Sequence, residues 1–240
     1  MNKIAIESLH FVYSGGVKAL QDISFVVNKG ETVGLIGANG AGKSTLLKLL
    51  VGLLDGYEGK IEIDGLAAEK KNLAQIRAKI GYVFQDSDSQ LFLSTVYEDV
   101  AFGPRNYGYT EEEVDRRVEA ALQKVHLEEL KNRHIYRMSG GEKKMASIAT
   151  ILSMEPEVML LDEPSLALDP RNRRNLIHIL NEIKETKIIA SHDLDMIWDT
   201  CERTLLLSEG RLVKDGKTRE LLTDKEFLEA NGLELPLRMQ

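Results

Sequence analysis

The 240-residue chain has one cysteine and few aromatic residues, which make up 6% of the sequence. A single cysteine, Cys201, cannot form a disulfide within the chain, so the sequence excludes a disulfide-built domain and favours a reducing compartment. Cys201 lies at helical spacing from Leu194 and Ile197. We therefore expect a buried thiol at this position and not a nucleophile.

Long apolar runs and an excess of positive charge are also missing. The most apolar windows, 46–54 and 158–161, are too short or interrupted to cross a bilayer, and no N-terminal segment has the pattern of a signal peptide. The chain carries 31 lysines and arginines against 38 acidic residues, a formal net charge of −7, which disfavours nucleic-acid binding through a basic surface. We expect a cytosolic chain, with docking on a membrane protein left open.

A phosphate-binding loop is the clearest feature that the sequence does contain. It follows the apolar run Thr32–Ile36 and matches the pattern G-x-x-x-x-G-K-S. Glycines let successive backbone N–H groups surround an anion, and the helix that begins near Lys43 adds the positive end of its dipole. We expect Lys43 to reach the β- and γ-phosphates of a nucleoside triphosphate and Ser44 to ligate Mg²⁺, since a plain glycine-rich turn does not explain Lys-Ser directly behind the last glycine. The loop consists of Gly37, Ala38, Asn39, Gly40, Ala41, Gly42, Lys43, Ser44 and Thr45.

The order of strands and helices predicts an α/β fold. Hydrophobic residues make up 43% of the chain, enough for the core of one large α/β domain. An antiparallel β region is expected at 4–7 and 24–27, with further strands at 32–36, 60–63, 80–84, 158–161 and 187–190. Strands that alternate with helices favour a mostly parallel core sheet with right-handed crossovers.

Residues from about 86 to 156 have a mainly helical pattern, which predicts a helical subdomain inserted into a single domain spanning 1–240. Thr110 and Glu113 predict a capping box at one helix start there. The helix after the phosphate loop, 46–54, is apolar on nearly every side, so we expect it to be buried. The helix that follows Thr110 has one apolar stripe, formed by Val114, Val118, Leu122 and Val125.

Two acids, Asp162 and Glu163, follow the apolar strand at 158–161. We expect Asp162 to hold the Mg²⁺ shell and Glu163 to polarise a water molecule for in-line attack on the γ-phosphate. In isolation, a strand that ends in solvated acids would be the better interpretation. In a chain that also has a phosphate loop, the catalytic interpretation is favoured.

A second glycine-containing helix start lies at Ser139-Gly140-Gly141. A serine hydroxyl and glycine amides at a helix N-terminus form an anion site, although an ordinary N-cap has the same pattern. Asp169, followed by Pro170, predicts the start of another helix.

Over nearly its whole length the chain resembles the ATP-binding subunit of ABC transporters. The resemblance rests on the order and spacing of the phosphate loop (Walker A), a glutamine after a strand (Q-loop), the Ser-Gly-Gly-Glu signature, the Asp-Glu pair of Walker B, a D-loop aspartate and a switch histidine. It implies an ATPase that uses ATP and Mg²⁺. It also implies that two subunits pair head to tail, so that Ser139, Gly140 and Gly141 act on the ATP of the partner.

The resemblance assigns roles to further residues. It implies that Tyr13 stacks on adenine, that Gln85 senses Mg²⁺ and the attacking water, that His192 contacts the γ-phosphate, and that Asp169 closes the D-loop. A half-buried strand aromatic remains the alternative for Tyr13, and satisfied loop residues the alternative for Gln85 and His192.

Three positions depart from the family pattern. Met138 replaces a leucine before the signature serine, an exchange of similar apolar residues. The D-loop Ser165–Asp169 lacks the usual glycine, which puts its backbone flexibility in doubt. Met145 stands where many relatives have an arginine, so an ion pair of the signature helix is expected to be absent.

The segments 85–92 and 96–104 resemble those of the energy-coupling-factor group, whose ATPases carry a second glutamine and a Glu-Asp-Val-Ala-Phe-Gly-Pro run. The resemblance implies that Glu98 and Asp99 accept charges from an arginine-bearing transmembrane partner. A solvated acidic helix is the alternative. Within the group, 141–144, 169–171 and the tail 233–237 are most similar to CbiO-type cobalt or nickel importers, with vitamin importers as the other option.

The leading hypothesis is thus an ATP-hydrolysing subunit, on the cytoplasmic face of the membrane, that drives an importer by closure of a dimer. The dimer is a homodimer or pairs this chain with a similar one, and integral membrane subunits complete the complex. The rivals are an ABC protein that acts on ribosomes or nucleic acid, a P-loop kinase and a non-hydrolysing regulatory binder. We expect no nucleic-acid partner, because the chain is acidic and has one nucleotide domain.

Overall fold

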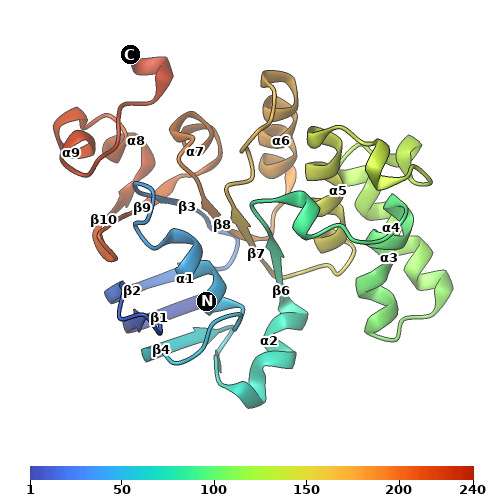
Figure 1. The fold of residues 1–240 in the computed structure, drawn as a ribbon, viewed down its shortest axis with the longest axis horizontal. Coiled ribbons are helices and arrows are strands. Elements are labelled where there is room, and N and C mark those ends of the chain that lie inside the picture. The colour runs from blue at the N-terminus through green and yellow to red at the C-terminus, as the bar shows by residue number, and fades with distance from the viewer.

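The computed structural model describes residues 1–240 and contains two β-sheets that flank one helix (Figure 1). The smaller sheet is antiparallel with strand order β2-β1-β4-β5, and it matches the β region that the sequence predicts near the N-terminus. Its strands are β1 (Asn2–Val12), β2 (Lys18–Asn28), β4 (Glu58–Ile63) and β5 (Leu66–Ala67).

The larger sheet has strand order β10-β9-β3-β8-β7-β6. All its neighbouring pairs are parallel except β10 with β9. Strands β3, β8 and β7 are almost fully buried, which is typical of a parallel sheet covered on both faces. This confirms the predicted mostly parallel core. Its strands are β3 (Thr32–Ile36), β6 (Ile80–Val83), β7 (Val158–Asp162), β8 (Thr186–Ala190), β9 (Arg203–Ser208) and β10 (Arg211–Lys217).

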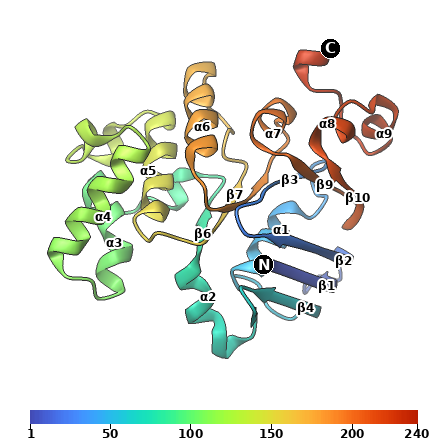
Figure 2. The same ribbon diagram turned by 180° about the vertical axis from the view of Figure 1, so that it is seen from behind.

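Helices cover the two faces of the larger sheet differently. Helix α1 lies between the two sheets and shares one core with them, while α6 and α7 pack on the opposite face (Figures 1 and 2). The core on that face, which includes residues of α6 and α7, contains Cys201, which is buried as expected. The helices around the sheets are α1 (Lys43–Leu50), α2 (Leu73–Lys79), α6 (Pro170–Glu182), α7 (Leu194–Thr200), α8 (Thr218–Leu221) and α9 (Lys225–Ala230).

The helical region lies between β6 and β7 in the chain, at the end of the molecule away from β10 (Figure 2). It contains α3 (Val96–Asn106), α4 (Glu111–Lys124) and α5 (Gly140–Leu152), which pack on one another. The predicted apolar stripe of α4 is buried in the core of this region. This long insertion connects the adjacent parallel strands β6 and β7. The carboxyl ends of these strands therefore remain available for functional loops.

Two sequence predictions about helices are wrong in detail. Thr110 caps α4 by accepting a hydrogen bond from the Glu113 amide, but the Glu113 carboxylate binds Arg116 and Arg117 and does not close a capping box. A guanidinium competes better for a carboxylate than a backbone amide does, because the bond is charge-assisted at both ends. Complete capping boxes form at the starts of α3 and α5 instead.

The apolar helix after the phosphate loop is shorter than the sequence predicts. Helix α1 ends at Leu50, where Gly52 adopts a left-handed backbone with φ of 65° and the Leu53 amide bonds back to the Lys48 carbonyl. This is the usual glycine-based helix termination. Leu53 lies beyond it and is 51% exposed, so it does not belong to the core, whereas Leu54 is partly buried and packs against the core.

Candidate functional site

The phosphate loop connects β3 to α1 and needs its glycines for steric reasons. Gly37, Gly40 and Gly42 have φ of 153°, 81° and 105°, which residues with a side chain rarely adopt. A Cβ at Gly42 would lie 2.7 Å from the Ala19 carbonyl oxygen, and one at Gly37 would overlap the Leu207 carbonyl. The loop borders a cavity of about 620 Å³, within the range of small-molecule sites.

Lys43 is 6% exposed and is held over the loop. Its Nζ donates to the carbonyl oxygens of Gly37, at 2.7 Å, and Ala38, at 3.4 Å, and lies 3.8 Å from Glu163 Oε1. Burial lowers the pKa of Lys43, and the nearby carboxylates of Glu163 and Asp162 oppose that shift. A buried cation that is hydrogen-bonded only to neutral carbonyls, with a carboxylate at 3.8 Å, is well placed to bind an anion that enters the cavity.

Asp162 is fixed at the end of β7 by two hydroxyl groups. Ser44 Oγ donates to its Oδ1 and Tyr82 OH donates to its Oδ2, each at 2.9 Å, and the aspartate is only 3% exposed. Burial raises the pKa of Tyr82, and the Asp162 charge adds to the shift, so this phenol stays protonated and donates. Tyr82 was not predicted as a site residue, because a tyrosine in a buried strand has no pattern that distinguishes it from a core residue.

Ser44 and Asp162 present hard oxygen ligands of the kind that Mg²⁺ prefers. No group of three or more His, Cys, Asp or Glu residues able to hold a metal occurs in the chain. Mg²⁺ commonly takes only one or two protein ligands and completes its shell with phosphate oxygens and water, so the chemistry of these two side chains fits that ion.

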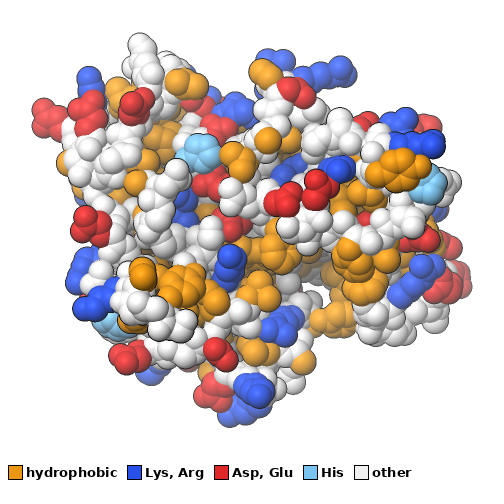
Figure 3. All heavy atoms as spheres, viewed as in Figure 1, with side chains coloured by type: hydrophobic (Ala, Val, Ile, Leu, Met, Phe, Trp, Pro, Cys, Tyr) orange, Lys and Arg blue, Asp and Glu red, His pale blue; other side chains and the backbone are white.

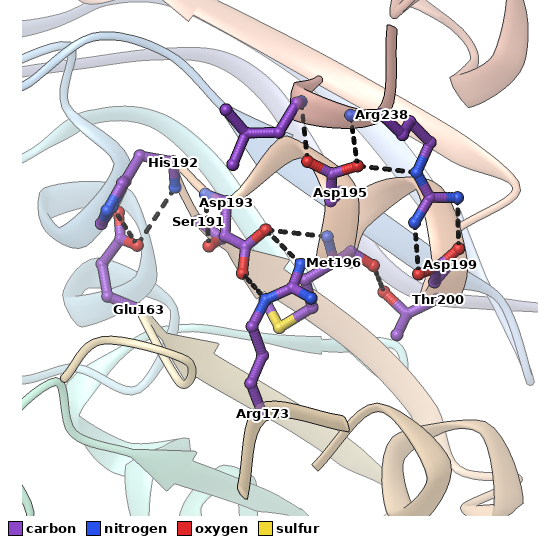
Figure 4. Close-up of polar contacts among 11 residues, drawn as sticks. Glu163, Arg173, Ser191, His192, Asp193, Asp195, Met196, Asp199, Thr200 and Arg238 are labelled. Carbon is purple, nitrogen blue, oxygen red and sulfur yellow. Dashed lines mark hydrogen bonds and ion pairs between the residues drawn. The ribbon is translucent and has the colours of Figure 1, made fainter. Parts of the chain in front are cut away.

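Glu163 and His192 meet at the edge of the cavity (Figure 4). Glu163 Oε2 accepts a hydrogen bond of 3.1 Å from the His192 amide and lies 2.8 Å from His192 Nδ1. Glu163 is 6% exposed and has φ of 47°, a strained conformation that its amide, bonded to the Ala190 carbonyl, helps to hold. The carboxylate is thereby oriented from β7, and the imidazole from the loop after β8.

Tyr13 and Gln85 line the same cavity from two other loops. Tyr13 follows β1, its ring is partly exposed, and its hydroxyl lies 2.9 Å from Thr45 Oγ1. Its ring also packs edge-on against Phe11. Gln85 follows β6 and its side chain is exposed. The loops after three parallel strands, the phosphate loop and the segment after β1 thus converge, as expected for ligand sites at the carboxyl ends of parallel strands.

The signature residues and Asp169 lie outside this cavity. Ser139 caps α5, and Ser139 and Gly140 are exposed, while Gly141 is buried against Asn172, whose side chain a Cβ would overlap. Asp169 caps α6 by accepting hydrogen bonds from the amides of Arg171 and Asn172, and these bonds lower its pKa. One chain therefore does not bring all the predicted ATP-binding residues together.

An ion-pair network that was not predicted surrounds the helix after His192 (Figure 4). Asp193 caps α7 and pairs with Arg173 of α6 at 2.6 Å. On the other side of α7, Arg238 near the C-terminus pairs with Asp195 and Asp199 at 2.6 Å each. These partners are 20 to 43 residues apart, so no local pattern links them.

The three departures from the family pattern have clear structural outcomes. Met138 and Met145 are 7% and 2% exposed and belong to the core of the helical region, where methionine fills space well. Ala167 in the D-loop has φ of 60°, a conformation that glycine adopts without strain. The D-loop therefore keeps its left-handed turn without the glycine.

No helix of the chain combines the length and the hydropathy that a membrane span requires. Comparison with known proteins identifies the family of the chain. The family model described as ABC transporter matches residues 20–166. The chain is 47% identical to a putative ABC transporter ATP-binding protein of Geobacter sulfurreducens, over 99% of this chain and 95% of that one. It is 43% identical to the energy-coupling factor transporter ATP-binding protein EcfA of Carboxydothermus hydrogenoformans, over 98% and 87% of the two chains.

Among solved structures, cbiO1 of Clostridium perfringens, described as part of the ABC transporter complex cbiONQ, superposes with a TM-score of 0.86 at 36% identity, covering 95% of this chain and 94% of that one. The fold, the phosphate loop beside two acids and these similarities agree. The chain belongs to the ABC transporter family, as an ATP-binding and ATP-hydrolysing subunit.

Proposed function

We propose that this chain is the ATPase of an energy-coupling-factor importer, a single domain over 1–240 whose inserted helical subdomain, about 86–156, contacts the membrane partner. The main support is that Lys43 and Glu163 line one cavity and that Asp162 is hydrogen-bonded to Ser44 of the same cavity, together with the similarity to EcfA and cbiO1. The solute that we infer is cobalt or nickel, because the tail and signature segments resemble the CbiO type. A vitamin importer is the alternative.

In this proposal the loop amides and Lys43 bind the β- and γ-phosphates of ATP. Ser44, Asp162 and Gln85 hold Mg²⁺, which supplies charge neutralisation at the phosphates when bound. Glu163 accepts the proton of the attacking water, and His192, held by the Glu163 carboxylate, contacts the γ-phosphate. Tyr13 provides an exposed ring beside the loop on which adenine stacks.

The second half of the ATP site comes from another subunit. Ser139 and Gly140 are exposed at the start of α5 and none of the signature residues lines the cavity of Lys43, so they are free to bind the ATP of a partner. Head-to-tail pairing of two copies, or of this chain with a similar one, gives two composite sites. ATP-driven closure of this dimer then powers the importer.

Substitution of the proposed base tests the chemistry. Glu163→Gln is nearly isosteric, so we expect ATP binding to persist and turnover to fall by about 100-fold or more. Glu112→Gln, on the exposed face of α4, is the matched control and keeps the native rate. Steady hydrolysis by Glu163→Gln at the native rate would refute the role of Glu163 as the base.

Complementation tests the pairing. Lys43→Ala removes the cation from one subunit and Ser139→Arg blocks the helix start of the other, so each homodimer is inactive. A mixture forms dimers in which one composite site is intact, and we expect activity to return, to at most about half of the native activity per mixed dimer. No recovery on mixing would contradict the head-to-tail arrangement.

An apolar groove between β6 and the helical region is the proposed docking site for the membrane partner. Its cavity measures about 350 Å³ and is bordered by Phe92, Phe102 and Tyr107, which are 63%, 42% and 51% exposed. Hydrophobic side chains gather where this region adjoins β6 and α2 (Figure 3). Exposed aromatic residues around a groove are typical of a protein interaction site.

Asp99 adds a specific acceptor to this groove. Its Oδ1 accepts from the amides of Phe92 and Leu93, but its Oδ2 is buried and has no hydrogen-bond partner. Burial raises the pKa of Asp99, against the effect of these amides. Glu98 is occupied in the capping box of α3, so Asp99 is the acceptor that we assign to an arginine on a helix of the partner.

Isolation of the complex from membranes tests the docking and the solute. A tagged chain should co-purify with small integral membrane subunits, and Asp99→Asn should weaken this association by about 30-fold or more, since one partner of a buried charge pair is lost. Uptake of radioactive cobalt, nickel and vitamins by cells expressing the complex identifies the solute. Association with ribosomes or DNA in place of membrane subunits would refute the proposal. The acidic and basic side chains are interspersed on the face in Figure 3, which argues against binding of nucleic acid there.

A further inference from the structure

Lys144 of the signature helix α5 is a buried cation that the proposed chemistry does not use. It is 2% exposed, and its Nζ donates to the carbonyl oxygens of Phe84, at 3.0 Å, and Gln85, at 2.9 Å. Burial lowers the pKa of Lys144 to about 8, which shows that its position is costly. A lysine held at this cost against two consecutive carbonyls fixes the backbone from which the Gln85 side chain projects.

Gln90 holds the same backbone from the other side. Its Oε1 accepts from the Phe84 amide at 3.0 Å, while its Nε2 donates to Ser147 O at 2.7 Å and Thr150 Oγ1 at 2.9 Å, both on α5. The amide and carbonyl of Phe84 are therefore both tied to α5, through Gln90 and Lys144. We therefore expect the Q-loop backbone to be displaced together with α5 when that helix moves.

The two ends of this linkage belong to different ATP sites in the head-to-tail dimer proposed above, on which this inference rests. Ser139 at the start of α5 faces the ATP of the partner, whereas Lys144 holds the Q-loop of its own site. The two residues are five positions apart, about 7.5 Å along a helix. Such a short helical segment transmits a displacement with little loss.

We propose that Lys144 and Gln90 are positioning residues that couple the two ATP sites, because they carry the position of the signature helix at one site to the Q-loop glutamine of the other. ATP engaged by Ser139 draws α5 toward the partner, and Lys144 then sets Gln85 for the ATP of its own subunit. Binding of one ATP thereby favours binding and hydrolysis of the second.

The rate of ATP hydrolysis, measured against ATP concentration, tests this coupling. We expect a Hill coefficient above 1 for the wild type, with a coupling factor of about fivefold or more between the sites. Lys144→Met keeps an unbranched apolar stem but loses the charge, and it should lower the Hill coefficient to 1. Lys144→Arg, which keeps a donor cation, should restore the cooperativity at least in part.

A matched control separates coupling from a general effect on the helix. Lys143, the neighbour of Lys144, also reaches the segment after Gln85, through Asp88, but the Asp88 side chain is 67% exposed and so exposed an ion pair contributes little. Lys143→Met should therefore leave the Hill coefficient unchanged and kcat within about twofold. Binding of a fluorescent ATP analogue to the single subunit should be the same in Lys144→Met and the wild type, because Lys144 does not line the ATP cavity. A purely structural role of Lys144 would weaken binding of the analogue to the Lys144→Met subunit as well as lower the Hill coefficient.

The outcomes distinguish this inference from the proposed function. If Lys144→Met folds and keeps the wild-type Hill coefficient, the inference is overturned. If it does not fold, Gln90→Met is decisive, since that variant should also lose cooperativity and a native Hill coefficient would overturn the inference. If the wild type dimerises and hydrolyses ATP with a Hill coefficient of 1, the coupling is refuted and the ATPase assignment stands. If the wild type stays monomeric with ATP, both the coupling and the proposed head-to-tail dimer are refuted.

Discussion

Removal of the Tyr82 hydroxyl would test how Asp162 is held. Tyr82→Phe deletes one oxygen and leaves the ring, so it creates almost no cavity. The deleted group donates the 2.9 Å hydrogen bond to Asp162 Oδ2, and both side chains are less than a tenth exposed. A hydrogen bond to a charged group contributes about 1.5–3 kcal/mol. Hydrogen bonds that orient a metal ligand typically change metal affinity by about 10–100-fold.

We therefore expect two effects of Tyr82→Phe that separate measurements can resolve. The free energy of unfolding in urea should fall by about 1.5–3 kcal/mol. The Mg²⁺ concentration for half-maximal ATP hydrolysis should rise by about 10–100-fold, with kcat at saturating Mg²⁺ nearly unchanged. Tyr57→Phe is the control, since that hydroxyl bonds the Ala68 carbonyl far from the site. A native Mg²⁺ dependence in Tyr82→Phe would show that Asp162 does not need this hydrogen bond to act as a ligand.

Three further predictions concern stability. Ala167→Gly should raise the free energy of unfolding by up to about 1 kcal/mol, because relief of a left-handed backbone (about 1–2 kcal/mol) exceeds the entropy that glycine costs (about 0.5–1 kcal/mol); a clear loss of stability in urea would contradict this. Burial acts to raise the pKa of Asp193, but Arg173 and the amide of Met196 hold this pKa below its ordinary value. Ionised Asp193 therefore stabilises the fold at every pH above its unfolded pKa of about 3.9. This contribution is lost as the pH falls toward the lower pKa of the folded state. The stability difference between wild type and Asp193→Asn should accordingly be largest near neutral pH and shrink below pH about 4, and a difference independent of pH would refute the ionic role. Leu50→Ala should cost about 2–5 kcal/mol and Leu53→Ala less than about 0.5 kcal/mol, measured by thermal or urea unfolding, and equal losses would place Leu53 in the core after all.

The sequence was sufficient to predict the parallel core and many of the residues that line the cavity, but not Val17, Lys18, Ala19 or Leu166. Continuous apolar runs such as Val158–Leu161 permit few interpretations other than a buried strand, and the phosphate loop has a spacing that follows from its mechanism. Because both features depend on neighbouring residues, they can be read without knowledge of the fold. The proximity of Lys43 to Glu163 and of Ser44 to Asp162 follows from these two features together.

Long-range polar contacts could not be predicted in the same way. Tyr82, Lys144 and Arg238 act through partners 39 to 80 residues away, and a tyrosine, lysine or arginine has the same appearance in sequence whether it is paired or solvated. Competition between local contacts caused the error at Glu113, where two arginines took the carboxylate that a capping box required. Such outcomes are decided by differences of about 1 kcal/mol, which residue patterns do not resolve.

The bonds between Arg238 and helix α7 close a ring of the chain around everything between them. Asp195 and Arg238 are 43 residues apart, and β9, β10, α8 and α9 all lie within this ring. Strand β9 in turn is paired with β3, the strand that leads into the phosphate loop. We therefore expect fraying of the last few residues to open this segment as one cooperative unit. When Arg238 is removed, amide exchange in α7 and in the hairpin of β9 and β10 should become faster together.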